Sequence, residues 1–237
     1  MRIQPSLRVG HNRTGLSAAS DEQRRRMLDV PRELGPTSRG SSDEIARVRI
    51  RYARTGMSVG TMPEVPRAQR GLLPLHDLLG ARLQFERTGV RMYDALLSKL
   101  DAHGGFSGGP DRGDLEQLRD EELAHMRMLE HMLEETGADP TVVTPTADLQ
   151  SMATRGVSDV LMDPRTTLLD GLGVIIMAEL ADHEEWIGLI DLGRDLGRNT
   201  LVHSFQSAQL TEEEHLIKVR RWLHAGRMAA RAELEIH

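Results

Sequence analysis

The chain contains no cysteine. It therefore cannot form disulfide bonds, zinc fingers, cysteine-ligated iron–sulfur centres or a cysteine nucleophile. Aromatic residues are also sparse at 3 %, so leucine and methionine supply much of the apolar content. Leucine and methionine are good helix formers, whereas aromatic residues are enriched in strands. The composition therefore predicts an all-α protein.

Long apolar runs are missing as well. No segment approaches the roughly 20 apolar residues that a membrane helix needs, and the N-terminus lacks the apolar core of a secretory signal. We therefore expect a cytoplasmic protein that has no membrane partner. At 237 residues the chain is long enough for one domain of ordinary size with an appendage.

Lysine is absent from the first 70 residues, which carry 14 arginines and 7 acidic residues, a net charge of about +7. Residues 71–237 carry 16 basic and 29 acidic residues, a net charge of about −13. Frequent proline and glycine and a low apolar density predict that residues 1–70 form a largely disordered, arginine-rich arm. A solvated tail or a polyanion-binding tail stays an open interpretation, although we do not expect nucleic acid as the main partner.

Apolar residues recur in steps of three and four along four long segments, which is the spacing of one buried helical face. We predict a domain over residues 71–228 and a C-terminal tail over residues 229–237. Asp111 or Asp114 should cap the second helix, Asp163 followed by Pro164 should begin the third, and Gly226 should stop or kink the fourth. A crossover with a short helix over residues 146–153 should join the second and third helices. The four long helices are expected over residues 72–100, 115–136, 164–189 and 199–226.

Acidic residues and histidines interrupt each apolar stripe at one level. In an E-x-x-H motif, the glutamate and the histidine three residues later project from the same face of a helix. A lone glutamate precedes each motif, by 36 residues in the first half of the domain and by 33 in the second. This near-repetition predicts a site with approximate twofold symmetry. The candidate metal ligands are Glu86, Glu122, His125, Glu179, Glu212 and His215.

Four carboxylates on inward stripes would repel one another, and each would cost several kcal/mol if it were buried without compensation. Two divalent cations would remove this problem, because their charge of +4 balances the charge of −4. Carboxylates with one imidazole per metal and no sulfur suit iron or manganese better than a closed zinc site. The pattern therefore predicts redox chemistry at two iron ions, with two manganese ions as the alternative.

Residues 72–226 resemble the ferritin-like di-iron carboxylate superfamily, with bacterioferritin and the helical domain of rubrerythrin as the nearest patterns. The resemblance rests on both E-x-x-H pairs, both lone glutamates and the long crossover. It implies an up-down four-helix bundle with the crossover between helices 2 and 3, and a homo-oligomer. It also implies metal-bridging roles for Glu122 and Glu212, terminal roles for Glu86 and Glu179, and one metal for each of His125 and His215. Tyr93 matches a tyrosine that these families place beside the centre, where it donates a hydrogen bond or one electron.

The chain departs from this pattern in two respects. Rubrerythrin carries a cysteine-ligated iron domain that supplies electrons, and a chain without cysteine needs an external donor instead. Asp182 and His183, one turn after Glu179, could support the ligands from outside or add a ligand where rubrerythrin-like sites have a glutamate.

The resemblance implies a ferroxidase, an oxidoreductase that oxidises Fe(II) with O2 or H2O2 for iron storage or detoxification. A rubrerythrin-like peroxidase and a manganese catalase are the alternatives among enzymes. A metal-stabilised adaptor protein without catalytic activity is a further alternative.

A second resemblance lies in the arm. The segment Met57-Ser58-Val59-Gly60-Thr61-Met62 resembles the short peptide by which cargo enzymes are held inside encapsulin shells. It implies an encapsulin shell protein as partner and localisation within that nanocompartment. An extended peptide would place its methionine and valine side chains in apolar pockets of the shell. An ordinary linker is the other interpretation of this segment.

Overall fold

The computed structural model describes residue 64 and residues 67–236. This part of the chain holds six α-helices, one 3-10 helix and no strand, so the prediction of an all-α protein is confirmed. No helix between residues 67 and 236 is long and apolar enough to cross a lipid bilayer. The segment from Met57 to Met62 lies outside the described residues.

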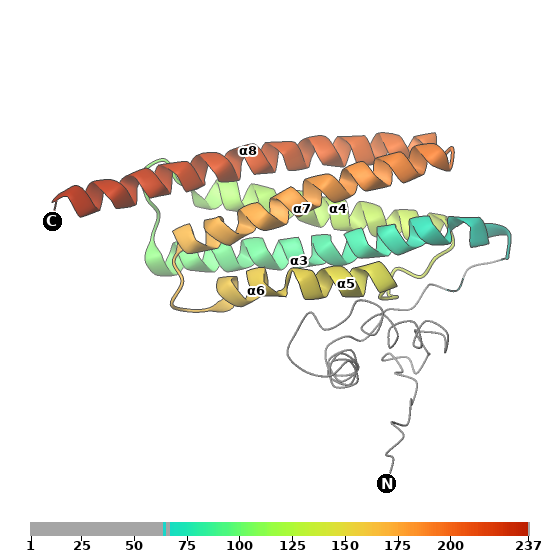
Figure 1. The fold of residues 1–237 in the computed structure, drawn as a ribbon, viewed down its shortest axis with the longest axis horizontal. Helices are drawn as coiled ribbons and strands as arrows, with labels where there is room; N and C mark the ends of the chain where they lie inside the picture. The colour runs from blue at the N-terminus through green and yellow to red at the C-terminus, as the bar shows by residue number, and fades with distance from the viewer. Residues whose placement is uncertain (1–63, 65–66, 237) are drawn as a thin grey trace, which may run out of the picture. The chain divides into compact units, whose positions relative to one another are not determined.

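Four long helices pack side by side, and two short helices lie along one of them (Figure 1). The 3-10 helix η1 (Arg67–Leu72) leads into α3 (Leu73–His103), α4 (Arg112–Glu135), α5 (Pro145–Ala153), α6 (Arg155–Met162), α7 (Leu168–Asp195) and α8 (Asn199–Ile236). Short turns join α3 to α4 and α7 to α8, which makes two helical hairpins. Contacts of α3 with α7 and of α4 with α8 bring the hairpins together.

The crossover between the hairpins contains α5 and α6, which both contact α3. The predicted short helix over residues 146–153 corresponds to α5, whereas α6 was not expected. Thr144 caps α5 with its hydroxyl, which accepts a hydrogen bond from the backbone N–H of Ala147, and it donates to the carbonyl oxygen of Asp77 on α3. This hydroxyl therefore ties the start of the crossover to the first long helix.

The start of α7 differs from the prediction. Thr167 is the N-cap, and its hydroxyl and the Asp170 carboxylate form a reciprocal capping box. Asp163 instead ends α6, and its carboxylate accepts hydrogen bonds from Arg165. The prediction at Asp163 was wrong because an Asp-Pro pair signals a cap only locally, and a threonine with an acidic residue three positions later competes successfully.

Gly226 does not stop the last helix, because α8 continues to Ile236. The predicted C-terminal tail is therefore helical over residues 229–236. Gly226 is buried, and a Cβ atom added there would lie 2.5 Å from Leu169 Cδ1 and 2.9 Å from Phe106 Cζ. The glycine is used for close packing of α8 rather than for its backbone freedom.

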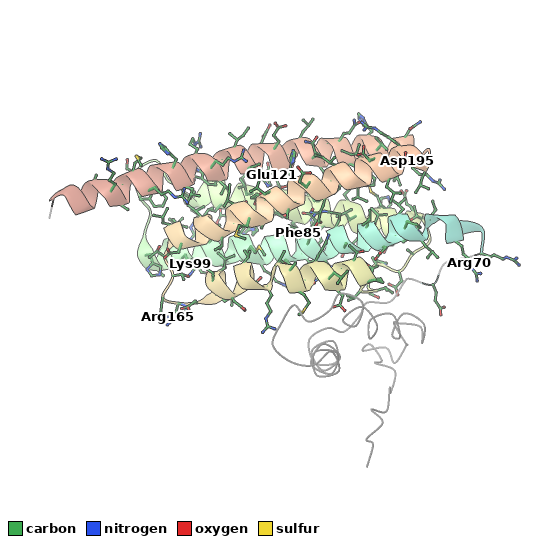
Figure 2. The ribbon with its side chains drawn as sticks, in the orientation of Figure 1. Arg70, Phe85, Lys99, Glu121, Arg165 and Asp195 are labelled. Carbon is green, nitrogen blue, oxygen red and sulfur yellow. The ribbon has the colours of Figure 1, made fainter. Side chains whose placement is uncertain are left out.

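The interior consists of two apolar clusters, and each contains residues from all four long helices. One cluster includes Leu96, Leu115, Leu172 and Trp222, and the other includes Leu79, Leu129, Leu189 and Phe205. On α4, α7 and α8 the predicted ligands lie between the residues of the two clusters, and on α3 Glu86 directly follows Phe85 at the border between them. Figure 2 shows Phe85 and Glu121, which flank this level, near the middle of the helices. A polar layer therefore divides the core in two.

Gly226→Ala should destabilise the protein by about 1–3 kcal/mol, because the added methyl group overpacks the contact with Leu169 and Phe106. Gly188→Ala on the exposed face of α7 is the matched control. No described atom beyond its own helix backbone lies within 4 Å of its added Cβ, so this change should stabilise by up to about 1 kcal/mol. Urea unfolding followed by circular dichroism measures both. Equal effects of the two changes would contradict the close packing.

Candidate metal centre

The structure brings all six predicted ligand residues together in the polar layer. Each of the four long helices contributes, and no residue of the set is more than 8 % exposed. The described residues contain three overlapping groups whose ligand atoms lie within 4.8 Å of one another and could hold a metal ion. These groups are Glu122, Glu179, Glu212 and His215; Glu86, His125 and Glu212; and Glu86, Glu122, Asp182 and Glu212.

The first half-site, around His215, is surrounded by three carboxylates. Its Nδ1 atom lies 3.1 Å from Glu212 Oε2, 3.4 Å from Glu122 Oε1 and 3.7 Å from Glu179 Oε2. The opposite ring nitrogen, Nε2, lies 2.8 Å from Glu121 Oε2. A hydrogen bond at Nε2 leaves Nδ1 as the lone-pair nitrogen of the neutral ring, directed at the carboxylates.

The second half-site, around His125, has fewer close carboxylates. Its Nδ1 atom lies 2.8 Å from Glu212 Oε1 and 3.7 Å from Glu86 Oε2. Glu212 therefore presents one oxygen to each histidine. This placement is what a carboxylate that bridges two cations requires.

The ligand atoms lie within ion-pair distance of one another, but many of them form no hydrogen bond. Seven buried atoms of the six residues have no hydrogen-bond partner within the described part of the chain. Each histidine Nδ1 atom lies close to carboxylate oxygens, at 2.8 Å for His125 and 3.1 Å for His215, but has no hydrogen-bond partner among the described residues. Unpaired buried polar atoms are costly, so convergence of seven of them fits a bound cation. The atoms are Glu86 Oε2, Glu122 Oε2, His125 Nδ1, Glu179 Oε2, both carboxylate oxygens of Glu212 and His215 Nδ1.

Gly89 makes room for one of these carboxylates. A Cβ atom added at Gly89 would lie 2.3 Å from Glu122 Oε2, so only glycine allows the carboxylate to lie against α3. This role of Gly89 was not expected from the sequence. The available signal was its position three residues after Glu86, where each E-x-x-H motif places a histidine.

The candidate tyrosine lies in the first half-site. The Tyr93 hydroxyl donates a hydrogen bond to Glu179 Oε1, and its ring meets the His215 ring edge-on at a centroid distance of 6.3 Å. Burial, together with the charges of Glu179 and Glu122, raises the pKa of Tyr93 well above its usual value. The phenol therefore keeps its proton and acts as a donor to the carboxylate.

The two candidate supporting residues, Asp182 and His183, lie in different surroundings. Asp182 is buried and belongs to the third group of possible ligands. His183 is only half-buried and points away, because its Nε2 atom lies 2.9 Å from the side-chain nitrogen of Gln209 on α8. Asp182 therefore joins the site, and His183 does not.

Sequence reasoning also missed Arg82, which is 1 % exposed. Its guanidinium donates to Glu86 Oε1 at 2.6 Å, to Asp182, and to Glu185 Oε2 at 2.6 Å. Arg82 precedes Glu86 by one helical turn, which was a signal for their contact. Its contacts with α7 could not be read from the sequence, because they depend on how α3 packs against α7.

The formal charges of the layer favour two divalent cations. Five buried carboxylates and Arg82 sum to a charge of about −4, which two divalent cations balance. The one carboxylate added by Asp182 and the one cation added by Arg82 cancel. The charge balance expected from the four glutamates alone is therefore preserved.

In the metal-free protein, protons take the place of the cations. Burial opposes charge on His125, but close oxygens of Glu212 and Glu86 outweigh it and raise its pKa to about 9. Burial likewise opposes charge on His215, yet contacts with Glu121, Glu122 and Glu212 raise its pKa above the usual value. Burial and neighbouring carboxylates raise the pKa of Glu122, and burial raises that of Glu179 to about 7. Metal binding must therefore displace protons.

None of the family models, characterised proteins or solved structures compared with this chain matches it. The geometry of the polar layer and the residues that form it are therefore the basis for assigning a function.

Metal affinity should rise with pH. Below pH 9 the His125 ring holds a proton that a metal must displace, so the apparent affinity should rise about tenfold per pH unit for each displaced proton. Calorimetric titration with Co(II) at pH 6, 7 and 8, in two buffers of different ionisation enthalpy, measures the affinity and the protons released. An affinity that does not change between pH 6 and 8 would show that the histidines are not ligands.

Proposed function

We propose that this chain is a di-iron oxidase, a ferroxidase with a ferritin-like four-helix bundle. One observation carries the proposal: seven buried ligand atoms from four helices converge and lack hydrogen-bond partners among the described residues. A structural core that merely tolerated acidic residues would pair them with donors. Here the seven ligand atoms lack such donors and face a common centre instead.

The donor set supports iron as the metal. Carboxylate oxygens dominate both half-sites, each half-site has one imidazole, and no sulfur is present. Such oxygen-rich sites suit iron and manganese, whereas structural zinc sites are usually closed by four nitrogen and sulfur ligands. We therefore expect two Fe(II) ions as substrates, one in each half-site, with two Mn(II) ions as the alternative content.

The reaction balances with either oxidant. Two Fe(II) ions lose one electron each, and O2 takes up these two electrons and two protons to give H2O2. With peroxide as the oxidant, two Fe(II), H2O2 and two protons give two Fe(III) and two water molecules. The two apolar clusters on either side of the layer limit access of bulk water. Glu212 and Glu122, which belong to more than one ligand group, would hold the two ions near each other.

Paired aromatic contacts support the bundle with approximate twofold symmetry. Tyr93 follows Glu86 by seven residues and contacts His215, and Trp186 follows Glu179 by seven residues and contacts His125. Each aromatic ring therefore covers the histidine of the opposite hairpin. The crossover with α5 and α6 fits the long connection that ferritin-like bundles carry between their second and third helices.

Glu122→Ala should slow Fe(II) oxidation at least about 100-fold, because it removes a ligand that belongs to two of the three groups. Stopped-flow mixing of anaerobic Fe(II)-loaded protein with O2 or H2O2 measures the rate. Glu116→Ala, on the same helix with a side chain that is 41 % exposed, is the control and should leave the rate unchanged.

Metal analysis of the protein purified without added metal accompanies this experiment. Oxidation by Glu122→Ala at the wild-type rate would contradict the proposal. Manganese in the purified protein, with O2 evolved from peroxide, would favour a catalase. A protein that binds metal but oxidises nothing would favour the adaptor hypothesis.

We also propose that the arm carries the chain into an encapsulin shell, on the resemblance of residues 57–62 to a cargo peptide. Deletion of residues 1–70 should abolish co-elution with co-expressed encapsulin shell protein in size-exclusion chromatography. A full-length chain with Met57, Val59 and Met62 changed to serine is the matched variant and should behave in the same way. Co-assembly of either variant at the wild-type level would contradict this targeting role.

A further inference from the structure

We propose that the two half-sites bind metal with unequal affinity, the His215 half-site tightly and the His125 half-site weakly, because Arg82 competes for the ligands of the second. This inference rests on the proposed metal centre. It assigns Arg82 a role as a positioning residue that sets how readily the second ion binds and leaves.

The His215 half-site is arranged in advance for a cation. The Glu121 carboxylate holds His215 Nε2 at 2.8 Å, and the Tyr93 hydroxyl holds one oxygen of Glu179. The other Glu179 oxygen and the His215 Nδ1 atom are left facing the site. Partners that orient ligands in this way strengthen metal binding, and their loss usually costs 10-fold to 100-fold in affinity.

The His125 half-site lacks the equivalent carboxylate. Glu121 precedes Glu122 on α4, but the residue that precedes Glu212 on α8 is Thr211. The ring of His125 is covered instead by Trp186, at a centroid distance of 5.6 Å. An aromatic ring restricts the imidazole but does not supply an anionic hydrogen-bond acceptor.

Arg82 occupies ligand atoms of the same half-site. Its guanidinium binds Glu86 Oε1 at 2.6 Å and also binds Asp182 Oδ1. The other Glu86 oxygen is the one that faces His125. A metal ion in this half-site would therefore share Glu86 with a permanent cation and would be repelled by it.

Arg82 has a further ion-pair partner that is not a candidate metal ligand. Its third partner, Glu185, has a side chain that is 25 % exposed and lies 2.6 Å from Arg82 Nη1. Phe85 and Trp186 cover the guanidinium at 4.7 and 5.1 Å from their ring centroids. Arg82 can thus stay paired with Glu185 when a metal draws Glu86 away, so the second ion binds against a cost but is not excluded.

The unequal arrangement suits a substrate ion. An ion in the His215 half-site would leave slowly, while an ion in the His125 half-site would exchange readily, because the guanidinium replaces it as the partner of Glu86. The Fe(III) ion of the His125 half-site would therefore leave before that of the His215 half-site.

Co(II) titration of the full-length protein tests the inference without any redox step. Calorimetry and Co(II) absorption should show two ions per chain in two classes, with dissociation constants that differ at least about tenfold. Arg82→Gln should tighten the weak class at least about tenfold and leave the tight class unchanged. Arg87→Gln is the control, because Arg87 lies on the same helix and pairs with Glu130 at the surface, and it should change neither class.

Glu121→Gln provides an independent variant at a partly exposed position, and it should weaken the tight class alone by about tenfold or more. Two equal sites in the wild type, or tightening of both classes by Arg82→Gln, would overturn the inference while leaving the proposed metal centre in place. If circular dichroism shows that Arg82→Gln does not fold, the inference is tested by the two Co(II)-binding classes of the wild type and by the effect of Glu121→Gln on the tight class. A wild type that binds no Co(II) would reject the proposed function itself.

Discussion

The structure depends on how five carboxylates are kept inside one helical domain. Glu86, Glu122, Glu179, Asp182 and Glu212 are almost fully buried in a single layer between two apolar clusters. Such a layer is stable only if positive charge enters it, from protons, from Arg82 or from metal ions. The helices above and below the layer are held by ordinary apolar packing. The folding of the domain and the binding of any cation in the layer are therefore linked through the same five side chains.

The layer is nearly symmetric, and its departures from symmetry lie at a few residues close to the lone glutamates. Each hairpin provides a lone glutamate, an E-x-x-H motif and an aromatic residue that covers the opposite histidine. Gly89 and Asp182, which occupy equivalent positions three residues after the lone glutamates, differ completely: one admits a carboxylate and the other adds one. Asp182 in turn requires Arg82, because an unpaired buried carboxylate would be costly. One extra acid on α7 is therefore coupled to one buried cation on α3.

This coupling bears on what the centre could do with its ions. A resident cofactor benefits from two equally firm half-sites, whereas a metal that is a substrate must also leave. Arg82 is a built-in competitor for Glu86, and Glu185 offers it a second partner close to the surface. The proposal of unequal half-sites thus rests on the proposed metal centre and assigns the buried guanidinium a role in it.

The sequence by itself determined the helical class, the level of the ligands and their grouping in two repeats. Spacing of three and four residues reports one face of one helix, so the inward positions of Glu86, Glu122 and His125 followed from local periodicity. Helix ends were less certain, because Asp163 and Gly226 carry signals whose outcome depends on neighbours. Only the tertiary structure decided that Arg82 reaches Asp182, that Glu121 supports His215, that Gly89 accommodates Glu122 and that His183 points away. Each of these contacts joins different helices, and their physical cause is the packing of one helix against another, which no periodicity along a single helix contains.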